Sequence, residues 1–194
     1  MAGTILVTGF VPFAHHERNI SQQVVESISS NAGLDCKINT SILTVDEKGS
    51  REISGRIQSG EEISAVLHLG FSENAEELLI EKFARNRFQM KIADNSLRME
   101  TTGKIASGKI TLQTNVPINI IDDHLEGIPE IRWNEDAGGF VCNETYYRSL
   151  LAASARKSPI VLFIHLPSED KISLVRQTEI ICNVCNALGS VSDL

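Results

Sequence analysis

Short apolar runs alternate along the chain with longer segments in which apolar residues recur every three or four positions. The runs at residues 4–8 and 65–70 predict buried strands, and residues 37–43 alternate as a strand with one exposed face does. Helical spacing covers residues 21–30 and, with a more polar surface, residues 47–59. The first third therefore predicts the order strand, helix, strand, helix, strand.

The same alternation continues to the end of the chain. It predicts a strand-like run at 77–86, a segment at 87–92 that enters a polar loop ending near Lys109, a strand near 110–113, a helix near 118–125, a strand at 130–133, a helix at 142–155, a strand at 159–165 and an amphipathic helix at 169–188. Strands alternating with helices pack as a parallel sheet covered on both faces. We predict an α/β fold, a single-domain α/β/α sandwich over residues 1–194 with a mixed, mostly parallel central sheet.

Composition narrows the class of protein. The chain has 18 basic and 25 acidic residues, a formal net charge of -7, and no basic cluster, so nucleic acid and anionic membranes are not expected partners. The start lacks the features of a secretory signal, and no segment reaches the roughly 20 apolar residues of a membrane span. We therefore expect a cytoplasmic protein whose four cysteines are not disulfide-bonded.

Three segments carry groups that work together in cysteine hydrolases. A cysteine attacks a carbonyl as a thiolate, which forms when a histidine takes its proton and a helix N-terminus stabilises the anion. Cys142 opens the predicted helix after a glycine turn, so the positive end of the helix dipole lies at its thiol. His165 ends a buried strand, where α/β sheets bind ligands. Glu81 shares a face with apolar neighbours, an unusual place for a carboxylate.

Each of these three residues also has an ordinary structural explanation. Cysteine is among the most buried residue types, so Cys142 alone could be an inert core thiol. His165 alone could be a structural histidine, and Glu81 alone could pair with Lys82 or Arg85. Only their joint occurrence favours chemistry.

Two other groups suggest metal or redox sites. Cys182 and Cys185 have the spacing of a half-site, but they lie inside the predicted terminal helix without a second pair of ligands, so core packing is expected. His15 and His16 are adjacent in a loop and lack the other ligands of a zinc site, so exposed loop residues are expected.

Four motifs occur in an order that resembles the pyroglutamyl peptidase I family, also called pyrrolidone-carboxylate peptidases. They are TGFVPF at 8–13, LIEKFA at 79–84, AGGFVCN at 137–143 and FIHLP at 163–167, and KIADN at 91–95 is similar to a further family block. The resemblance runs from about residue 4 to residue 167 and fades beyond it.

The resemblance implies an enzyme, a cysteine peptidase that hydrolyses the bond after an N-terminal pyroglutamyl residue of peptide substrates. It implies that Cys142 is the nucleophile and that His165 ionises it and then protonates the leaving amine. Glu81 would orient the imidazole and stabilise its charge. Backbone N–H groups at the start of the Cys142 helix are the expected oxyanion donors. No cofactor and no metal are expected.

A pyroglutamyl group is a flat, uncharged lactam, so its pocket is expected to be mostly apolar. The residues that the resemblance places at this pocket are Phe10, Phe13, Asn19, Phe71, Phe140 and Val141. Core packing is the alternative for the aromatic residues. Phe71 stands where many members carry a different residue, so a substrate contact could be lost there.

The chain also departs from the family. Lys91 replaces a frequent arginine, and Asn134, Glu135 and Asp136 replace Ser-Asn-Thr. Two carboxylates near the thiol would disfavour the thiolate and slow its attack. The connection between the histidine motif and the terminal helix is predicted to be shorter than in several members. Because such a segment can pack on a neighbouring subunit, we expect a monomer or dimer rather than the frequent tetramer.

Two alternative functions stay open. One is a catalytically weak or silent binding protein on the same fold. The other, less favoured, is a nucleotide-binding Rossmann-like protein, because Thr8 and Gly9 follow the first strand. A phosphate cradle needs further glycines next, and Val11, Pro12, Phe13 and Ala14 stand there instead.

Overall fold

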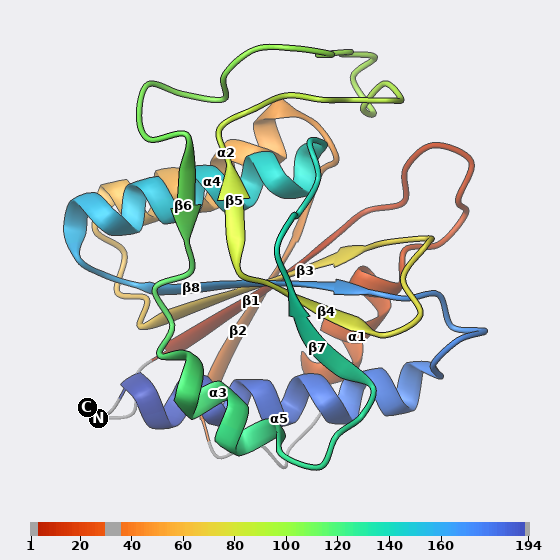
Figure 1. The fold of residues 1–194 in the computed structure, drawn as a ribbon, viewed down its shortest axis with the longest axis vertical. Coiled ribbons are helices and arrows are strands. Elements are labelled where there is room, and N and C mark those ends of the chain that lie inside the picture. The colour runs from red at the N-terminus through yellow and green to blue at the C-terminus, as the bar shows by residue number, and fades with distance from the viewer. Residues whose placement is uncertain (1–3, 30–35, 193–194) are drawn as a thin grey trace.

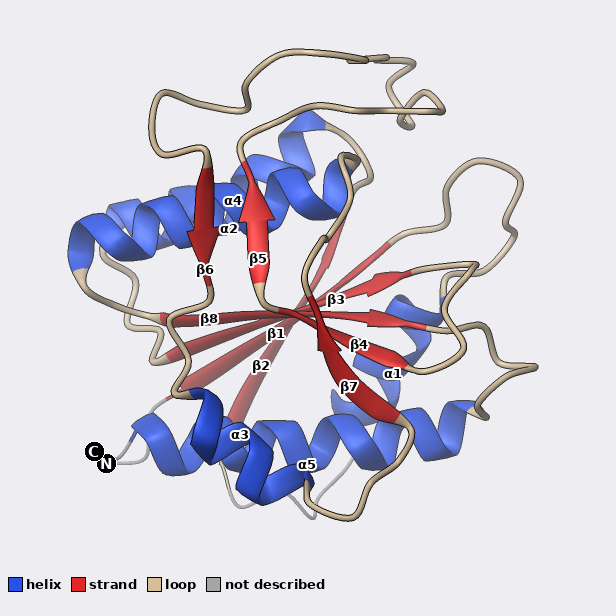
Figure 2. Ribbon diagram, viewed as in Figure 1, coloured by secondary structure: helices blue, strands red, loops and turns tan. Residues whose placement is uncertain are grey.

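The computed structural model describes residues 4–29 and 36–192. A six-stranded twisted sheet runs through the centre, with α2 and α4 on one face and α1, α3 and α5 on the other (Figures 1 and 2). The strands are β1 (Thr4–Phe10), β2 (Lys37–Leu43), β3 (Ala65–Phe71), β4 (Leu78–Glu81), β5 (Phe83–Arg85), β6 (Thr111–Gln113), β7 (Ile131–Asn134) and β8 (Ile160–Leu166). The helices are α1 (Ile20–Ser29), α2 (Glu47–Ser59), α3 (Ile118–Leu125), α4 (Val141–Arg156) and α5 (Leu174–Ser192).

The order of strands in the main sheet is β2-β1-β3-β8-β4-β7. Strands β2, β1, β3 and β8 are parallel, whereas β4 lies antiparallel to β8 and carries β7 parallel to itself. Strands β5 and β6 form a separate antiparallel pair that packs on α4. The predicted α/β fold with a mixed, mostly parallel sheet is confirmed.

Alternation along each strand separates two cores. Ile80 and Ile164 point to the face covered by α1, α3 and α5, and Phe163 points to the face covered by α2 and α4. Because successive side chains of a strand point to opposite faces, Glu81 and His165 share the second face with Phe163. Both therefore point toward α4, the helix that begins next to Cys142.

Element boundaries differ from the sequence-based prediction at two places. The run at 77–86 was expected as one strand, but the chain turns at Lys82 and places β4 and β5 in different sheets. The terminal helix begins at Leu174 rather than near Glu169, so a turn-rich connection follows β8. Ser30, the expected end of the first helix, lies outside the described residues. No helix in the described ranges has the length and apolarity needed to cross a membrane.

A buried charge network fastens the long loop between β5 and β6 to α4 (Figure 1, top). The Glu144 carboxylate has no exposed surface and accepts hydrogen bonds from Arg98 (2.7 Å) in that loop and from Arg148 (2.8 Å) one turn along the helix. Arg98 also pairs with the buried Asp94 at 2.8 Å. Since a buried ion must be paired, this network sets the position of the loop over the start of α4.

The network predicts a large effect of Glu144→Gln on stability. The amide keeps the shape of the side chain but leaves two guanidinium groups without their shared counter-charge. Removing one partner of a buried ion pair costs about 3 kcal/mol or more, and we expect a loss of that size in the free energy of unfolding. Urea denaturation followed by circular dichroism measures it.

Glu47→Gln is the matched control. Glu47 pairs with Arg51 at 2.7 Å, but their side chains are 50% and 56% exposed. Exposed pairs contribute little, so its loss should stay within about 1 kcal/mol. Equal losses in the two variants would contradict the anchoring role of Glu144.

Candidate active site

A buried carboxylate and imidazole form the centre of the site. His165 Nδ1 donates a hydrogen bond to Glu81 Oε1 over 2.7 Å, and Glu81 has no exposed surface. The register explains the contact, because Leu79 of β4 lies opposite His165 of β8 and Glu81 points to the same face two residues on. The sheet thus brings together two residues 84 positions apart in the sequence.

Cys142 reaches the same point from the first turn of α4. Its thiol hydrogen bonds the His165 ring, whose Nδ1 is used by Glu81. Gly70 lies opposite His165 in β3, and a side chain there would come within 3.0 Å of Cys142 Sγ and 2.8 Å of the Phe163 ring. The missing side chain at Gly70 therefore leaves the space that the thiol occupies. The structure brings Glu81, Cys142 and His165 together.

The surroundings of His165 favour its charged form. Burial acts to lower the pKa of His165, but the hydrogen bonds and negative charges of Cys142 and Glu81 outweigh it and raise that pKa to about 10. His68 on the same sheet face shows the opposite case. Its ring lies between the hydroxyls of Thr8 (2.7 Å) and Ser149 (3.0 Å), and burial lowers its pKa to about 3. Of these two buried histidines, His165 holds a proton at neutral pH and His68 does not.

Asn134 completes the surroundings of Glu81, a contact that is not evident from the sequence. Its Nδ2 lies 3.1 Å from Glu81 Oε1 and 2.9 Å from Oε2, and it also donates to the Asp136 carbonyl oxygen at 3.1 Å. Asn134 pairs with Glu81 in the register of β7 and β4. The sequence placed this residue in the motif before Cys142, but only the strand pairing shows which carboxylate it contacts.

Two further residues of α4 fix the helix against these strands. The Tyr146 hydroxyl donates to the backbone carbonyl of Glu81 at 2.9 Å. The carboxamide of Asn143 accepts from the Arg85 N–H and donates to the Arg85 carbonyl, both at 2.8 Å. Cys142 therefore sits on a helix that is bonded to β4 and β5 on either side of Lys82.

Two of the predicted pocket residues, Phe13 and Phe140, pack against the same core as Cys142, whereas Phe71 packs against the core on the other face of the sheet. The Phe13 and Phe140 rings lie 5.7 Å apart, and Phe140 is the N-cap residue of α4, two positions before Cys142. His16 links them to Phe71, because its ring lies 5.6 Å from Phe13 and contacts Phe71 edge to face at 5.0 Å. All of these rings are partly exposed, so they form an accessible aromatic group at the mouth of the site.

The other three predicted pocket residues have different surroundings. Phe10 and Val141 lie in the core between the sheet and the α2–α4 layer, with 2% and 0% of their surface exposed. Asn19 donates to the Val11 carbonyl at 3.1 Å and accepts from the Ser21 N–H and hydroxyl. Its carboxamide thus holds the loop after β1 to the start of α1.

Of the two carboxylates expected near the Cys142 thiol, Asp136 is paired with arginines. Asp136 pairs with Arg87 at 2.9 Å and lies 3.6 Å from the Arg85 guanidinium, and Glu135 is exposed. Because arginines face Asp136, its negative charge is balanced locally. Lys91 is exposed in the long loop.

The other cysteines lie away from this chemistry. Cys185 of α5 is fully buried in the core, and burial, then the neighbouring Cys36 and Cys182, raises the pKa of its thiol well above the usual value. The prediction that Cys185 packs in the core is confirmed.

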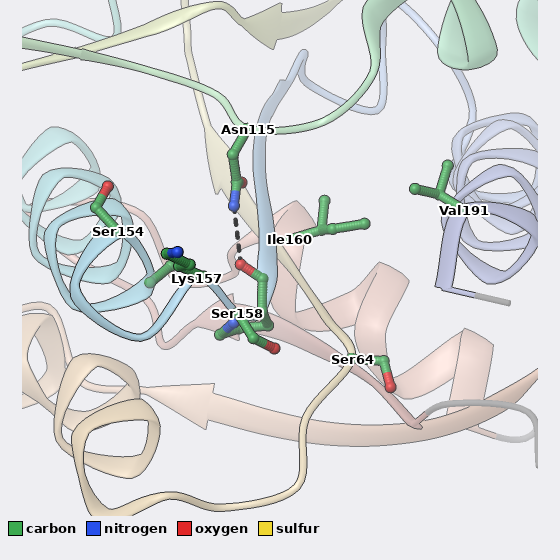
Figure 3. A pocket seen from close by; sticks show the side chains of 9 residues that line it. Ser64, Asn115, Ser154, Lys157, Ser158, Ile160 and Val191 are labelled. Carbon is green, nitrogen blue, oxygen red and sulfur yellow. Dashed lines mark hydrogen bonds between the residues drawn. The ribbon is translucent and has the colours of Figure 1, made fainter. Parts of the chain in front are cut away.

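A separate pocket lies at the opposite edge of the sheet (Figure 3). It is lined by residues that include Ser64, Asn115, Lys157, Ser158 and Ile160, where β3 and β8 begin, whereas His165 is near the end of β8. The Asn115 amide is already bonded to the Pro159 carbonyl at 3.0 Å. This pocket offers no thiol, imidazole or carboxylate, so it adds nothing to the site at Cys142.

Comparison with known proteins agrees with this geometry. The chain is 25% identical over 173 residues to a pyrrolidone-carboxylate peptidase of Oceanobacillus iheyensis, covering 88% of this chain and 86% of the relative. It is 30% identical to pyrrolidone-carboxylate peptidase 1 of Ralstonia nicotianae, covering 84% and 78%. The solved pyrrolidone carboxyl peptidase of Fervidobacterium islandicum superposes with a TM-score of 0.88 at 25% identity, covering 97% and 99%.

A sequence model that describes the pyroglutamyl peptidase family matches residues 3–181. This match spans β1 through the first part of α5 and includes Glu81, Cys142 and His165. The chain therefore belongs to the pyroglutamyl peptidase family of cysteine peptidases.

Proposed function

We propose that the protein hydrolyses the bond after an N-terminal pyroglutamyl residue of peptides, through a Cys142-His165-Glu81 triad. The contacts that support this most directly are the 2.7 Å hydrogen bond between His165 and the buried Glu81 carboxylate and the interaction of the partly exposed Cys142 thiol with the same ring. A chain of nucleophile, base and orienting group is the arrangement that nucleophilic acyl transfer needs.

In the first step the Cys142 sulfur attacks the pyroglutamyl carbonyl carbon. The proton of the thiol has passed to His165, whose raised pKa keeps it there at neutral pH. As the carbon–nitrogen bond breaks, the imidazolium gives this proton to the leaving amine of the peptide. Water, deprotonated by His165, then cleaves the thioester, which releases pyroglutamate and restores the thiol.

The start of α4 supplies the oxyanion site in this proposal. Phe140 at the N-cap has no side-chain oxygen and makes no capping hydrogen bond. Since the first N–H groups of a helix have no intrahelical acceptor, those next to Cys142 are available to the substrate oxygen. The positive end of the helix stabilises the negative charge that develops there.

Substrate selection rests on the aromatic group at the mouth. Phe13 and Phe140 offer an apolar, partly exposed surface on the sheet face that carries the thiol, and His16 joins Phe71 to it at the edge. An uncharged lactam loses little hydration on entering it, whereas a charged N-terminal amine would be desolvated without a partner. We therefore propose that pyroglutamyl peptides are accepted ahead of peptides with a free amine.

Asn134 is a positioning residue in this mechanism. It contacts both oxygens of Glu81 and so fixes the carboxylate in the plane that suits His165. A loose carboxylate would let the imidazole rotate away from the thiol. Asn134 therefore acts on the reaction through Glu81 and touches no substrate.

Residues 1–194 act as one pyroglutamyl-peptidase-like domain in this proposal. A reducing compartment such as the cytoplasm suits it, because the nucleophilic thiol must stay reduced. The proposed assembly is a monomer or dimer. This expectation was based on a short connection before a helix that starts near Glu169. In the structure the connection extends from Pro167 to Ser173, so it is longer than the sequence indicated.

The nucleophile is tested by Cys142→Ala. Turnover of a fluorogenic pyroglutamyl amide should fall below detection while the thermal midpoint stays nearly unchanged, because the thiol contributes little packing. Cys182→Ala, on α5, is the control and should keep full activity. In wild-type protein iodoacetamide should label Cys142 first and the buried Cys185 last. Equal labelling of all thiols together with an active Cys142→Ala protein would refute the mechanism.

The carboxylate is tested by Glu81→Gln. The amide keeps the shape but removes a charge that raises the pKa of His165. The turnover number should fall about 10²-fold, with little change in KM. In wild-type protein His165 loses its proton near pH 10, so activity should decline at that alkaline limit. The decline should begin at lower pH in Glu81→Gln, and an unchanged pH–rate profile would argue against the proposed role.

Asn134→Ala should lower the turnover number and move the alkaline decline in activity to lower pH, both by less than Glu81→Gln does. It leaves the charge of Glu81 but removes its clamp, so the turnover number should fall and Asn134→Ser should recover part of it. Asn115→Ala, in the pocket at the opposite edge, is the matched control and should leave the pH–rate profile as it is. A profile that Asn134→Ala does not move would leave Asn134 with a purely structural role.

The assembly is tested by light scattering on the purified protein at low micromolar concentration. A monomer or dimer is expected. A stable tetramer would show that the connection before α5 does not limit assembly.

A further inference from the structure

Two loops meet at the mouth of the Cys142 site. Strands β1 and β3 are parallel neighbours, so the loops that follow them leave the sheet on the same side (Figure 1). The loop after β1 carries His15 and His16, and the loop after β3 carries Glu73. Their ligand atoms, two imidazole nitrogens and one carboxylate oxygen, all lie within 4.8 Å of one another.

We propose that His15, His16 and Glu73 bind a zinc-type divalent cation that joins the two loops. Two histidines and one glutamate are a ligand set that zinc accepts, with a fourth position left for water or another ligand. Ligand atoms of a tetrahedral zinc site lie about 3.3 Å apart. Since His15 and Glu73 are exposed and His16 is partly exposed, rotation of these side chains can close the remaining distance.

The turn after β1 holds the two imidazoles side by side. The His16 N–H donates to the Phe13 carbonyl at 3.1 Å, and Ala14 between them has a left-handed backbone with φ 52°. The two rings lie 4.2 Å apart, and the edge of Phe71 supports His16 from the other side. His16 is therefore restrained before a cation binds, which lowers the ordering cost of binding.

The position of this site gives it a consequence for access to the thiol. His16 contacts Phe13, which packs on the same core as Cys142, and Phe71, which closes the aromatic group on the other side of the sheet edge. A cation bound to His16 and Glu73 would hold both loops, and with them both rings, in one arrangement. The cation would thus reversibly restrict access of substrate to the Cys142 thiol. This effect on activity rests on the proposed peptidase function, whereas the binding of the cation does not.

Isothermal titration of Zn²⁺ into Cys142→Ser protein tests the binding directly, because the substitution removes the reactive thiol as a competing ligand. One zinc per chain should bind. His15→Asn and Glu73→Gln should each weaken binding by at least about tenfold. His15 is the histidine to change, since His16 also packs on Phe71.

Two controls match the residue types. His124→Asn alters a histidine on α3, and Glu17→Gln alters a carboxylate one position after His16 that is outside the group. Neither should change the affinity for zinc. Binding that survives in His15→Asn and Glu73→Gln, or no binding at millimolar zinc, would overturn the proposal.

Activity then separates the two proposals. With Cys142 intact, zinc should inhibit wild-type turnover more strongly than that of Glu73→Gln. Zinc binding at this site without any peptidase activity would refute the proposed function and keep the metal site. Full activity without binding would refute the metal site and keep the proposed function.

Discussion

The buried charge of Glu81 is the constraint on which the rest of the site depends. A carboxylate without exposed surface needs charged or hydrogen-bonding partners, because burial alone costs several kcal/mol. His165 of β8 and Asn134 of β7 supply them, and both can reach Glu81 only if β4 lies between their strands. This requirement gives a physical reason for the place of β4 between β8 and β7. The order of these strands and the contacts of Glu81 therefore depend on each other.

Burial by itself does not decide what a histidine does in this protein. His68 and His165 lie on neighbouring strands, on the same sheet face, and both are buried. The partners of His68 are two neutral hydroxyls, so desolvation dominates and the ring is uncharged. The partners of His165 can carry negative charge, so the ring is charged. The difference between a core histidine and a proton carrier lies in one neighbouring carboxylate and one thiol.

Apolar periodicity predicts the layers of the fold, because it reports which side chains are buried. Glu81, Cys142 and His165, which the structure brings together, were selected from motifs that occur in the order of the family. The sequence does not predict contacts made by strand pairing. Asn134 was interpreted as part of the motif before Cys142, and Glu73 was not associated with His15, because each meets its partner across the sheet rather than along the chain. The predicted element boundaries are also wrong where tertiary contacts determine them. At Lys82, for example, the chain leaves the main sheet and enters the β5–β6 pair.

The departures of this chain from its family fall mainly in loops, and the structure shows why they need not disturb the reacting groups. Glu81, His165 and Gly70 are positioned by strand register, and Cys142 by a helix bonded to β4 and β5. Asp136 changes the charge near the thiol, yet Arg85 and Arg87 face it from β5 and the loop that follows. His15 and His16 alter the rim without touching the Glu81 contacts. The loops and the sheet therefore have separate effects. Substitutions in the loops change access to the thiol, whereas the strands keep the His165 imidazole charged. The departures of this sequence from its family thus concern access rather than the acid–base groups.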